Sequence, residues 1–284
     1  MRRYLKGIFV CGLIVVVSLF VFRHAFYRTY KKFIEYGKLT YVTLKNKQFN
    51  KKNNDTLQLQ NLVAHGGGGI ENLDFSNSLE ALNVSYNKGF RFIELDFERT
   101  SDGCLVLIHD WGKSIPKLYG KPPRRYSLQE YKNLRMINGM TNLSLVDLAN
   151  WIKQHPDVFI ITDIKYDNIR ALTKIKERFP ELVKNFIPQI YHFYEYLPVQ
   201  NLGYEHIILT LYVAVYSDEA VLKFAKRYLP TAVTMPFKRA LTDLPRKLKR
   251  LDIPTYAHTV NETWLQRKLY ANGVFGVYTD FLIP

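Results

Sequence analysis

The chain has 284 residues, of which 47% are hydrophobic and 23% are charged, and its formal net charge is +15. This composition is typical of a globular protein and excludes a chain that is disordered or collagen-like throughout. Two cysteines are too few for a disulfide scaffold. Residues 1–60 hold 12 Lys and Arg but only 2 Asp and Glu, so the rest of the chain is only mildly basic. We therefore expect no nucleic-acid partner.

The first predicted element is a membrane anchor at the N-terminus. Residues 8–22 are 15 uncharged, mostly apolar residues with basic residues on both sides. As a helix they measure about 22 Å, which is less than a bilayer core of about 30 Å. Arg23 stands where a cleaved signal peptide needs a small residue, which favours an uncleaved single-pass anchor over residues 1–27. We expect the domain that follows to lie on the extracytoplasmic side.

Residues 28–60 form a basic segment rich in Lys, Asn and Gln. Two interpretations remain open for it. It is either a tether that lies near anionic lipid head groups or a solvated linker that binds nothing.

From residue 61 onward, short apolar runs alternate with helical patterns. Strands are predicted at 61–65, 90–97, 104–109, 157–164, 185–191, 206–211, 231–235, 253–258 and 274–279. Helices are predicted at 78–88, 127–135, 144–154, 167–178, 217–228, 241–251 and 262–272. Alternating strands and helices over 61–284 indicate an α/β fold with a parallel sheet.

Nine predicted strands fit either a closed TIM (β/α)8 barrel with one additional strand or a doubly wound sheet. No G-x-G-x-x-G motif follows the first strand, so we prefer the barrel. Only seven residues separate 97 from 105, too few for a crossover helix. The second and third strands therefore form a hairpin, or the chain returns in extended form.

Charged and imidazole side chains cluster at the ends of the first four predicted strands, where TIM barrels carry their functional residues. The six are His65, Glu94, Asp96, His109, Asp163 and Lys165. Three carboxylates without a cysteine are oxygen ligands suited to Mg²⁺ or Ca²⁺. Two histidines suit acid and base catalysis, and a lysine suits a phosphate oxygen. Glycines at 66–69 allow close approach of the backbone to a ligand.

The segment AHGGGGIENLDFSNSLEALNVSYNKGFRFIELDFERTSDGCLVLIHDW resembles the first half of glycerophosphodiester phosphodiesterases. IPQIY, HTVNE and YTDF resemble signatures further along that family's sequences. The resemblance covers about residues 65–281 and implies the phospholipase-C-like phosphodiesterase TIM barrel. It also implies metal-assisted cleavage of a phosphodiester substrate.

The resemblance further implies roles for single residues. His65 and His109 match the catalytic acid and base, Glu94 and Asp96 match metal ligands, Asp163 stands where the family usually has a Glu ligand, and Lys165 matches the phosphate-contacting Lys. Gly66 and Gly67 are substrate-binding candidates because their backbone lacks a Cβ. Which histidine is the acid stays open.

Two positions depart from the family pattern. Gly66 replaces the usual Arg, and Ser76 replaces a Glu that binds metal. Glu71 is a candidate substitute for that Glu, and His258 replaces a frequent Trp. The remaining ligands also resemble those of the sphingomyelinase D branch, which acts on choline phospholipids. The departures therefore bear on which substrate is bound more than on the reaction class.

Two further alternatives remain open. One is a non-catalytic, membrane-tethered binding protein on a degenerate barrel, because fold alone does not fix function. The other is a glycosidase with two catalytic carboxylates, which explains fewer of the clustered residues, because that chemistry needs neither the two histidines nor the lysine.

The basic segment 110–143 is either a lid over the pocket or simply a basic loop.

Overall fold

The computed structural model describes residues 57–284. The predicted anchor (1–27) and all but the end of the predicted tether (28–60) lie outside the described residues. Within 57–284 no helix combines the length and apolar character needed to cross a membrane. Residues 58–284 form one compact unit, and they contain the complete sheet and its core.

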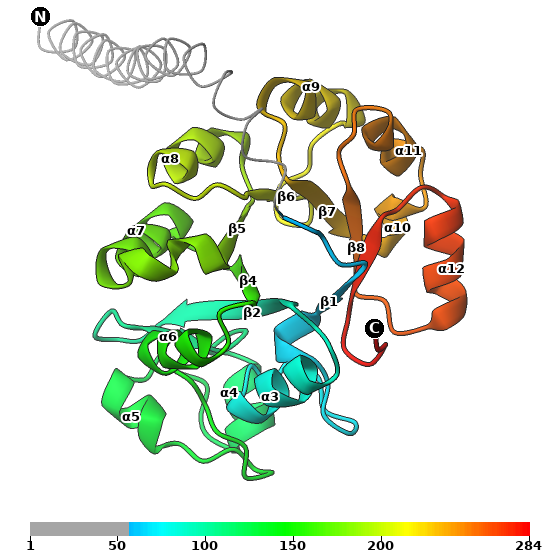
Figure 1. Ribbon diagram of the computed structural model, residues 1–284. Coiled ribbons are helices and arrows are strands. Elements are labelled where there is room, and N and C mark those ends of the chain that lie inside the picture. The colour runs from blue at the N-terminus through cyan, green and yellow to red at the C-terminus, as the bar shows by residue number, and fades with distance from the viewer. Residues whose placement is uncertain (1–56) are drawn as a thin grey trace, which may run out of the picture. The chain divides into compact units, whose positions relative to one another are not determined.

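Eight parallel strands form a closed barrel with helices on its outside (Figure 1). The strands are β1 (Leu62–Ala64), β2 (Phe92–Arg99), β4 (Phe159–Asp163), β5 (Phe186–Ile190), β6 (Ile208–Thr210), β7 (Ala232–Pro236), β8 (Thr255–His258) and β9 (Gly276–Thr279). Ala64 pairs with Ile93 of β2, and Leu62 pairs with Val277 of β9, so β1 closes the ring. The predicted TIM barrel is confirmed, and the doubly wound sheet is excluded.

Most strand residues are buried, because helices cover the outer face and side chains fill the interior. The helices are α3 (Leu79–Asn87), α4 (Ser114–Tyr119), α5 (Leu128–Asn133), α6 (Leu145–Gln154), α7 (Asn168–Arg178), α8 (Tyr196–Asn201), α9 (Asp218–Tyr228), α10 (Phe237–Ala240), α11 (Leu244–Lys249) and α12 (Thr263–Ala271). Short 3₁₀ turns are η1 (His65–Gly67), η2 (Pro180–Asn185) and η3 (Phe193–Glu195).

Serine side chains cap the starts of two of the predicted helices. Ser144 and Ser217 accept hydrogen bonds from Asp147 N and Ala220 N, which begins α6 and α9. Helix α12 has no side-chain cap, because Asn261 Oδ1 accepts from the Asp280 backbone N–H instead. Helices α4, α8 and α10 were not predicted: α4 and α8 contain a proline, and α10 has only four residues.

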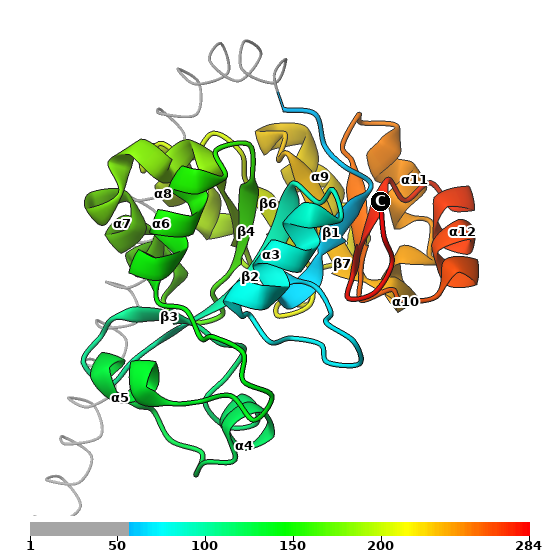
Figure 2. The ribbon, with the colours of Figure 1, turned by 60° about the horizontal axis from the view of Figure 1, so that its bottom comes forward.

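The additional strand β3 (Leu105–Leu107) pairs antiparallel with β2, so the hairpin alternative is correct. The segment 108–143 follows this hairpin and contains α4 and α5, which lie beyond the end of the barrel where β2 ends (Figure 2). It has a hydrophobic cluster of its own that includes Trp111, Tyr131 and Met136. The insertion is therefore a folded, packed layer and not an open solvated loop.

Candidate active site

Three carboxylates gather inside the barrel at the carboxyl ends of two neighbouring strands. Glu94 and Asp96 alternate along β2, and Asp96 is the register partner of Asp163 on β4. Side chains two residues apart, and register partners on parallel strands, point to the same side of a sheet. All three are buried, and one oxygen from each lies within 4.8 Å of the others. The sequence-predicted metal ligands are thus brought together.

Lys165 and Asn77 hold this cluster in place. The Lys165 ammonium lies 2.9 Å from Asp96 Oδ1 and 3.1 Å from Asp163 Oδ2. Asn77 Nδ2 donates to Asp96 Oδ2 at 3.1 Å, and Asn77 Oδ1 accepts from the Asp96 backbone N–H at 2.9 Å. Asp96 is therefore fixed by two residues that are 19 and 69 positions away in the chain.

The pKa values of the cluster's titratable groups shift in different directions. Burial raises the pKa of Glu94 well above its usual value, and the negative charge of Asp96 raises it further. Burial also opposes the ionisation of Asp96, but Lys165 and His109 outweigh it and lower the pKa of Asp96. Burial lowers the pKa of Lys165, whereas the two aspartates more than reverse this effect. Three carboxylates face one ammonium, so the donor set fits a hard divalent cation.

Two tyrosines donate hydrogen bonds to Asp163. Tyr212 donates to both oxygens of Asp163, at 2.9 and 2.7 Å, and Tyr191 donates to Oδ1. Burial, followed by the charge of Asp163, raises the pKa of both phenols, which therefore stay protonated donors at neutral pH. The orientation of Asp163 is thus set by β5 and β6 loops that the sequence analysis did not assign to the site.

His65 forms the second part of the site. Its Nδ1 lies 2.9 Å from Asp280 Oδ1 and 3.2 Å from Thr259 Oγ1. Burial lowers the pKa of His65, but the hydrogen bond to Asp280 and the charges of Glu94, Asp280 and Asp96 raise it to about 9. His65 is therefore mostly an imidazolium at neutral pH.

His109 lies two residues after β3. Its Nδ1 is 2.9 Å from Asp110 Oδ2, and its Nε2 is 4.0 Å from Asp96 Oδ1. The ring of Phe75 contacts both histidines, with centroid distances of 4.3 Å to His65 and 5.2 Å to His109. Both imidazoles therefore face one apolar ring beside the carboxylate cluster.

The glycine loop explains why Phe75 sits there. Gly66 has φ of 55°, and a Cβ on it would lie 2.9 Å from Phe75 Cα. Its backbone N–H donates to Glu94 Oε2 at 2.8 Å. An arginine at position 66 is thus incompatible with this packing. The buried Ser76 hydroxyl is 3.0 Å from that of Ser78, and Glu71 is exposed and lies outside the group of three carboxylates.

His258 at the end of β8 forms part of the wall beyond Tyr212, with ring centroids 5.4 Å apart. Burial lowers its pKa to about 3, so the imidazole is neutral. Its Nε2 is buried and has no hydrogen-bond partner among residues 57–284.

Several residues of the site were missed as functional residues although their motifs had been noticed. Asp280 belongs to YTDF and Asn261 to HTVNE, and Asn261 Nδ2 donates to Asp280 Oδ2 at 2.8 Å. Asn77 follows the departure at Ser76. The motifs were a usable signal for these three. Tyr191 likewise belongs to IPQIY, whereas no local pattern pointed to Tyr212.

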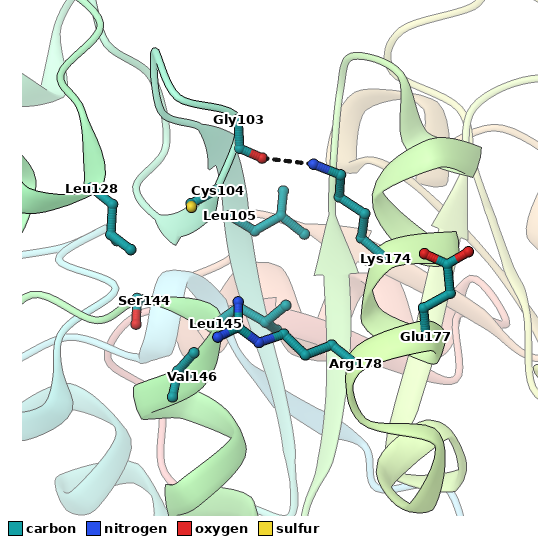
Figure 3. A pocket seen from close by; sticks show the side chains of 10 residues that line it. All are labelled: Gly103, Cys104, Leu105, Leu128, Ser144, Leu145, Val146, Lys174, Glu177 and Arg178. Atoms are coloured by element: carbon teal, nitrogen blue, oxygen red, sulfur yellow. Dashed lines mark hydrogen bonds between the residues drawn. The ribbon is translucent and has the colours of Figure 1, made fainter.

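A pocket of about 310 Å³ lies outside the barrel, between the β2–β3 hairpin and helices α5, α6 and α7 (Figure 3). Leu105, Leu128 and Val146 line it, and Lys174 at its edge donates to the Gly103 carbonyl at 2.9 Å. None of the six predicted site residues lines this pocket. It is therefore separate from the candidate active site.

Comparison with solved structures agrees with the fold. Glycerophosphodiester phosphodiesterase from Thermotoga maritima matches with a TM-score of 0.62 and 21% identity, over 79% of this chain and 96% of that chain. A protein described as a putative glycerophosphodiester phosphodiesterase from Galdieria sulphuraria matches with a TM-score of 0.65 and 17% identity, over 80% and 95%. An Oleispira antarctica phosphodiesterase, solved with the product sn-glycerol-3-phosphate, matches with a TM-score of 0.57 and 16% identity, over 78% and 94%.

A sequence profile adds information that the fold alone does not give, because one barrel fold hosts many activities. The profile of the glycerophosphoryl diester phosphodiesterase family matches residues 65–283. This range begins at His65 and includes every residue of the carboxylate cluster. Because the match covers well over half of the chain, the chain belongs to the glycerophosphoryl diester phosphodiesterase family and is a phosphoric diester hydrolase.

Proposed function

We propose that this protein is a metal-dependent phosphodiesterase that hydrolyses glycerophosphodiesters or related phospholipid head-group phosphodiesters by histidine acid–base catalysis. The observation that carries the proposal is that His65 and His109 both contact the ring of Phe75, beside three buried carboxylates and a lysine. A binding protein without catalysis has no need for two oriented imidazoles next to a cation site.

Glu94, Asp96 and Asp163 are the residues that would hold the cation, and Mg²⁺ and Ca²⁺ both suit their oxygens. When bound, such an ion supplies charge neutralisation for the phosphodiester. Lys165 provides a second positive charge, and it is positioned by the same carboxylates. The missing Cβ atoms of Gly66 and Gly67 make room for Phe75 and Ala81, and the Gly66 N–H donates to Glu94, so both glycines shape the site from behind its side chains.

The two histidines have different surroundings, which supports different roles. His65 holds a proton through its contact with Asp280, so we assign it as the general acid that protonates the leaving alkoxide. His109 is more exposed and is oriented by Asp110, so we assign it as the base that takes a proton from a substrate hydroxyl or a water.

Phe75 favours a second candidate within the same reaction class. The ring occupies the space beside Gly66 and contacts both histidines, so the wall that the family lines with Arg is apolar here. An apolar wall suits a substrate that carries a lipid chain, as in a sphingomyelinase-D-like phospholipid phosphodiesterase. Replacing Phe75 with Arg should then shift preference from lipid to water-soluble diesters.

We further propose that residues 1–27 anchor the protein in a membrane and that the hydrolase domain lies on the extracytoplasmic side. The support is the apolar run 8–22 between basic flanks and the Arg23 that disfavours cleavage. Membrane fractionation of the full chain tests the anchor. Protease accessibility of residues 58–284 from each side of the membrane tests the side on which the domain lies.

The function is tested by activity of residues 58–284 on glycerophosphocholine, glycerophosphoethanolamine, lysophospholipids and sphingomyelin, with Mg²⁺ or Ca²⁺ and with chelator. We expect chelator-sensitive release of one head-group class. His65→Ala and His109→Ala should each remove turnover without unfolding the protein, and Asp157→Ala on the surface is the matched control. Full turnover in both histidine variants would contradict the assignment, and no reaction with any substrate at saturating metal would favour the binding protein.

A further inference from the structure

The exposed hydrophobic side chains of the barrel are concentrated at one end. Among residues 57–284, ten large hydrophobic side chains are well exposed, and nine of these ten lie at the end of the barrel where the strands end. Six lie between a strand and the main helix that follows it, Trp264 lies in the first turn of α12, and Phe281 and Ile283 follow β9. These segments surround the opening of the active site. The nine are Ile137, Tyr166, Tyr194, Val213, Val215, Leu241, Trp264, Phe281 and Ile283, and the tenth, Leu229, lies at the opposite end.

Four of them follow three adjacent strands, β4, β5 and β6, and form a continuous arc. Their exposed fractions are 77% for Tyr166, 62% for Tyr194, 44% for Val213 and 99% for Val215. Single exposed hydrophobic residues are common on soluble proteins. Their restriction to one end, around one opening, is not expected from random scatter and suggests a surface that meets a partner.

The loops that carry this arc are held together. The ring of Phe193 stacks on that of Tyr216 with centroids 3.9 Å apart, and His192 Nδ1 lies 3.3 Å from Tyr216 Oη. Arg239 from the next loop donates to the Tyr216 carbonyl at 2.7 Å. These contacts fix the loop 211–217, so Val213 and Val215 project from a packed support.

The same end of the molecule also carries the excess positive charge. The insertion 108–143 contains seven Lys and Arg and two Asp and Glu, a net charge of +5. Residues 61–284 as a whole contain 28 and 23, also +5, so the remainder of the barrel is neutral. All seven basic residues are exposed, and the insertion extends beyond the site end of the barrel (Figure 2).

We propose that the site end of the barrel is a membrane-docking surface, and that its partner is a bilayer containing anionic lipids. Tyrosine, tryptophan and aliphatic side chains enter the interfacial region, while lysine and arginine bind anionic head groups. The apolar side chains lie on separate loops around the opening, so a broad partner such as a bilayer suits them better than a single peptide. The charge of the insertion complements an anionic surface. Docking in this way places the active site over head groups in the plane of the membrane.

The chain that precedes the barrel is long enough to permit this orientation. The chain enters β1 at Leu62, at the end of the barrel opposite the site. Residues 28–60 span at most about 110 Å when extended and about 30 Å as a flexible coil. A barrel helix of 11 residues measures about 17 Å. A protein anchored through residues 1–27 therefore has enough chain to turn its site toward the same bilayer.

Tryptophan fluorescence of the full chain tests this orientation directly. The chain has three tryptophans, of which Trp264 is 63% exposed while Trp111 and Trp151 are buried. We expect brominated phosphatidylcholine, mixed with phosphatidylglycerol in reconstituted vesicles, to quench Trp264 emission, and Trp264→Phe to abolish this quenching. Equal emission in brominated and ordinary vesicles would overturn the proposal.

Vesicle binding by residues 58–284 tests the surface without the anchor. We expect Val215→Asp to weaken binding to phosphatidylcholine–phosphatidylglycerol vesicles about tenfold, the factor expected when the transfer of one valine side chain is lost. Leu229→Asp is the matched control at the opposite end and should bind as the unmodified fragment does. Thermal unfolding checks that both variants are folded.

Two results would overturn the proposal in this assay. One is equal binding by the Val215→Asp and Leu229→Asp variants. The other is no binding by the unmodified fragment, which would make the exposed end a protein-docking face instead. The docking proposal goes beyond the proposed function. Neither fluorescence quenching nor vesicle binding depends on turnover, so these assays can refute the docking proposal without bearing on the proposed hydrolase activity.

Discussion

The ion pair between His65 and Asp280 makes the stability of the barrel depend on pH in a defined direction. The pKa of His65 is raised from an ordinary value of 6.5 to about 9. A group whose pKa is raised on folding stabilises the folded state fully below the unfolded pKa. This contribution is lost as the pH rises through the folded pKa. The relevant window therefore runs from about pH 6.5 to pH 9.

Replacing Asp280 with Asn keeps the size of the side chain and removes its charge. The difference between 6.5 and about 9 corresponds to roughly 3 kcal/mol, since each tenfold change in proton affinity contributes about 1.4 kcal/mol. The charges of Glu94 and Asp96 cause part of this pKa rise, and that part remains in the variant. We therefore expect Asp280→Asn to lower the free energy of unfolding at pH 6 by about 2 kcal/mol. At pH 10 the loss should be clearly smaller.

Urea unfolding of residues 58–284 at pH 6 and pH 10, with chelator present, measures this difference. Asp157→Asn is a suitable control, because Asp157 pairs with Arg91 on the surface and is half exposed. Proton titration of His65 by NMR should show its pKa falling in the Asp280→Asn variant. An equal loss of stability at both pH values, or an unchanged titration, would refute the reasoning.

Three further substitutions have defined outcomes. We expect Mg²⁺ or Ca²⁺ to raise the melting temperature of the unmodified protein, and Glu94→Gln to abolish this rise, since it removes one of the three proposed ligands; scanning calorimetry with added metal measures this. Tyr131→Phe should cost about 1–3 kcal/mol in urea unfolding, because its buried hydroxyl donates to the Leu107 carbonyl at 2.8 Å. Gly68→Ala should lower the melting temperature in the same calorimetry, because φ is 90° and the new Cβ would lie 2.2 Å from Ser85 Oγ.

The sequence alone predicted the parts of the fold that depend on short-range order. All nine strands form where apolar runs were found, because a strand buried on both faces has the same local composition wherever it lies in the sheet. Alternation along β2 also placed Glu94 and Asp96 on one side. These two features depend on the period of the backbone and need no knowledge of distant contacts.

The composition of the site was likewise predictable, because TIM barrels present residues from strand ends at one opening. His65, Asp163 and Lys165 were placed correctly by this rule. The choice between a hairpin and an extended return for β3 was not predictable, since seven residues fit both. The prediction for the insertion rested on its charges, whereas its packing depends on Trp111 and Tyr131, which pack against each other and against further hydrophobic residues of the insertion.

Tertiary structure alone decided which residues orient the predicted ones. Asp280 reaches His65 across 215 positions because β9 pairs with β1 when the barrel closes. Tyr212 reaches Asp163 across 49 positions because both lie at the carboxyl ends of strands on one side of the ring. Local periodicity specifies which way a side chain points from its own strand. The partner it meets depends on how the ring of strands closes, and that is a property of the whole chain.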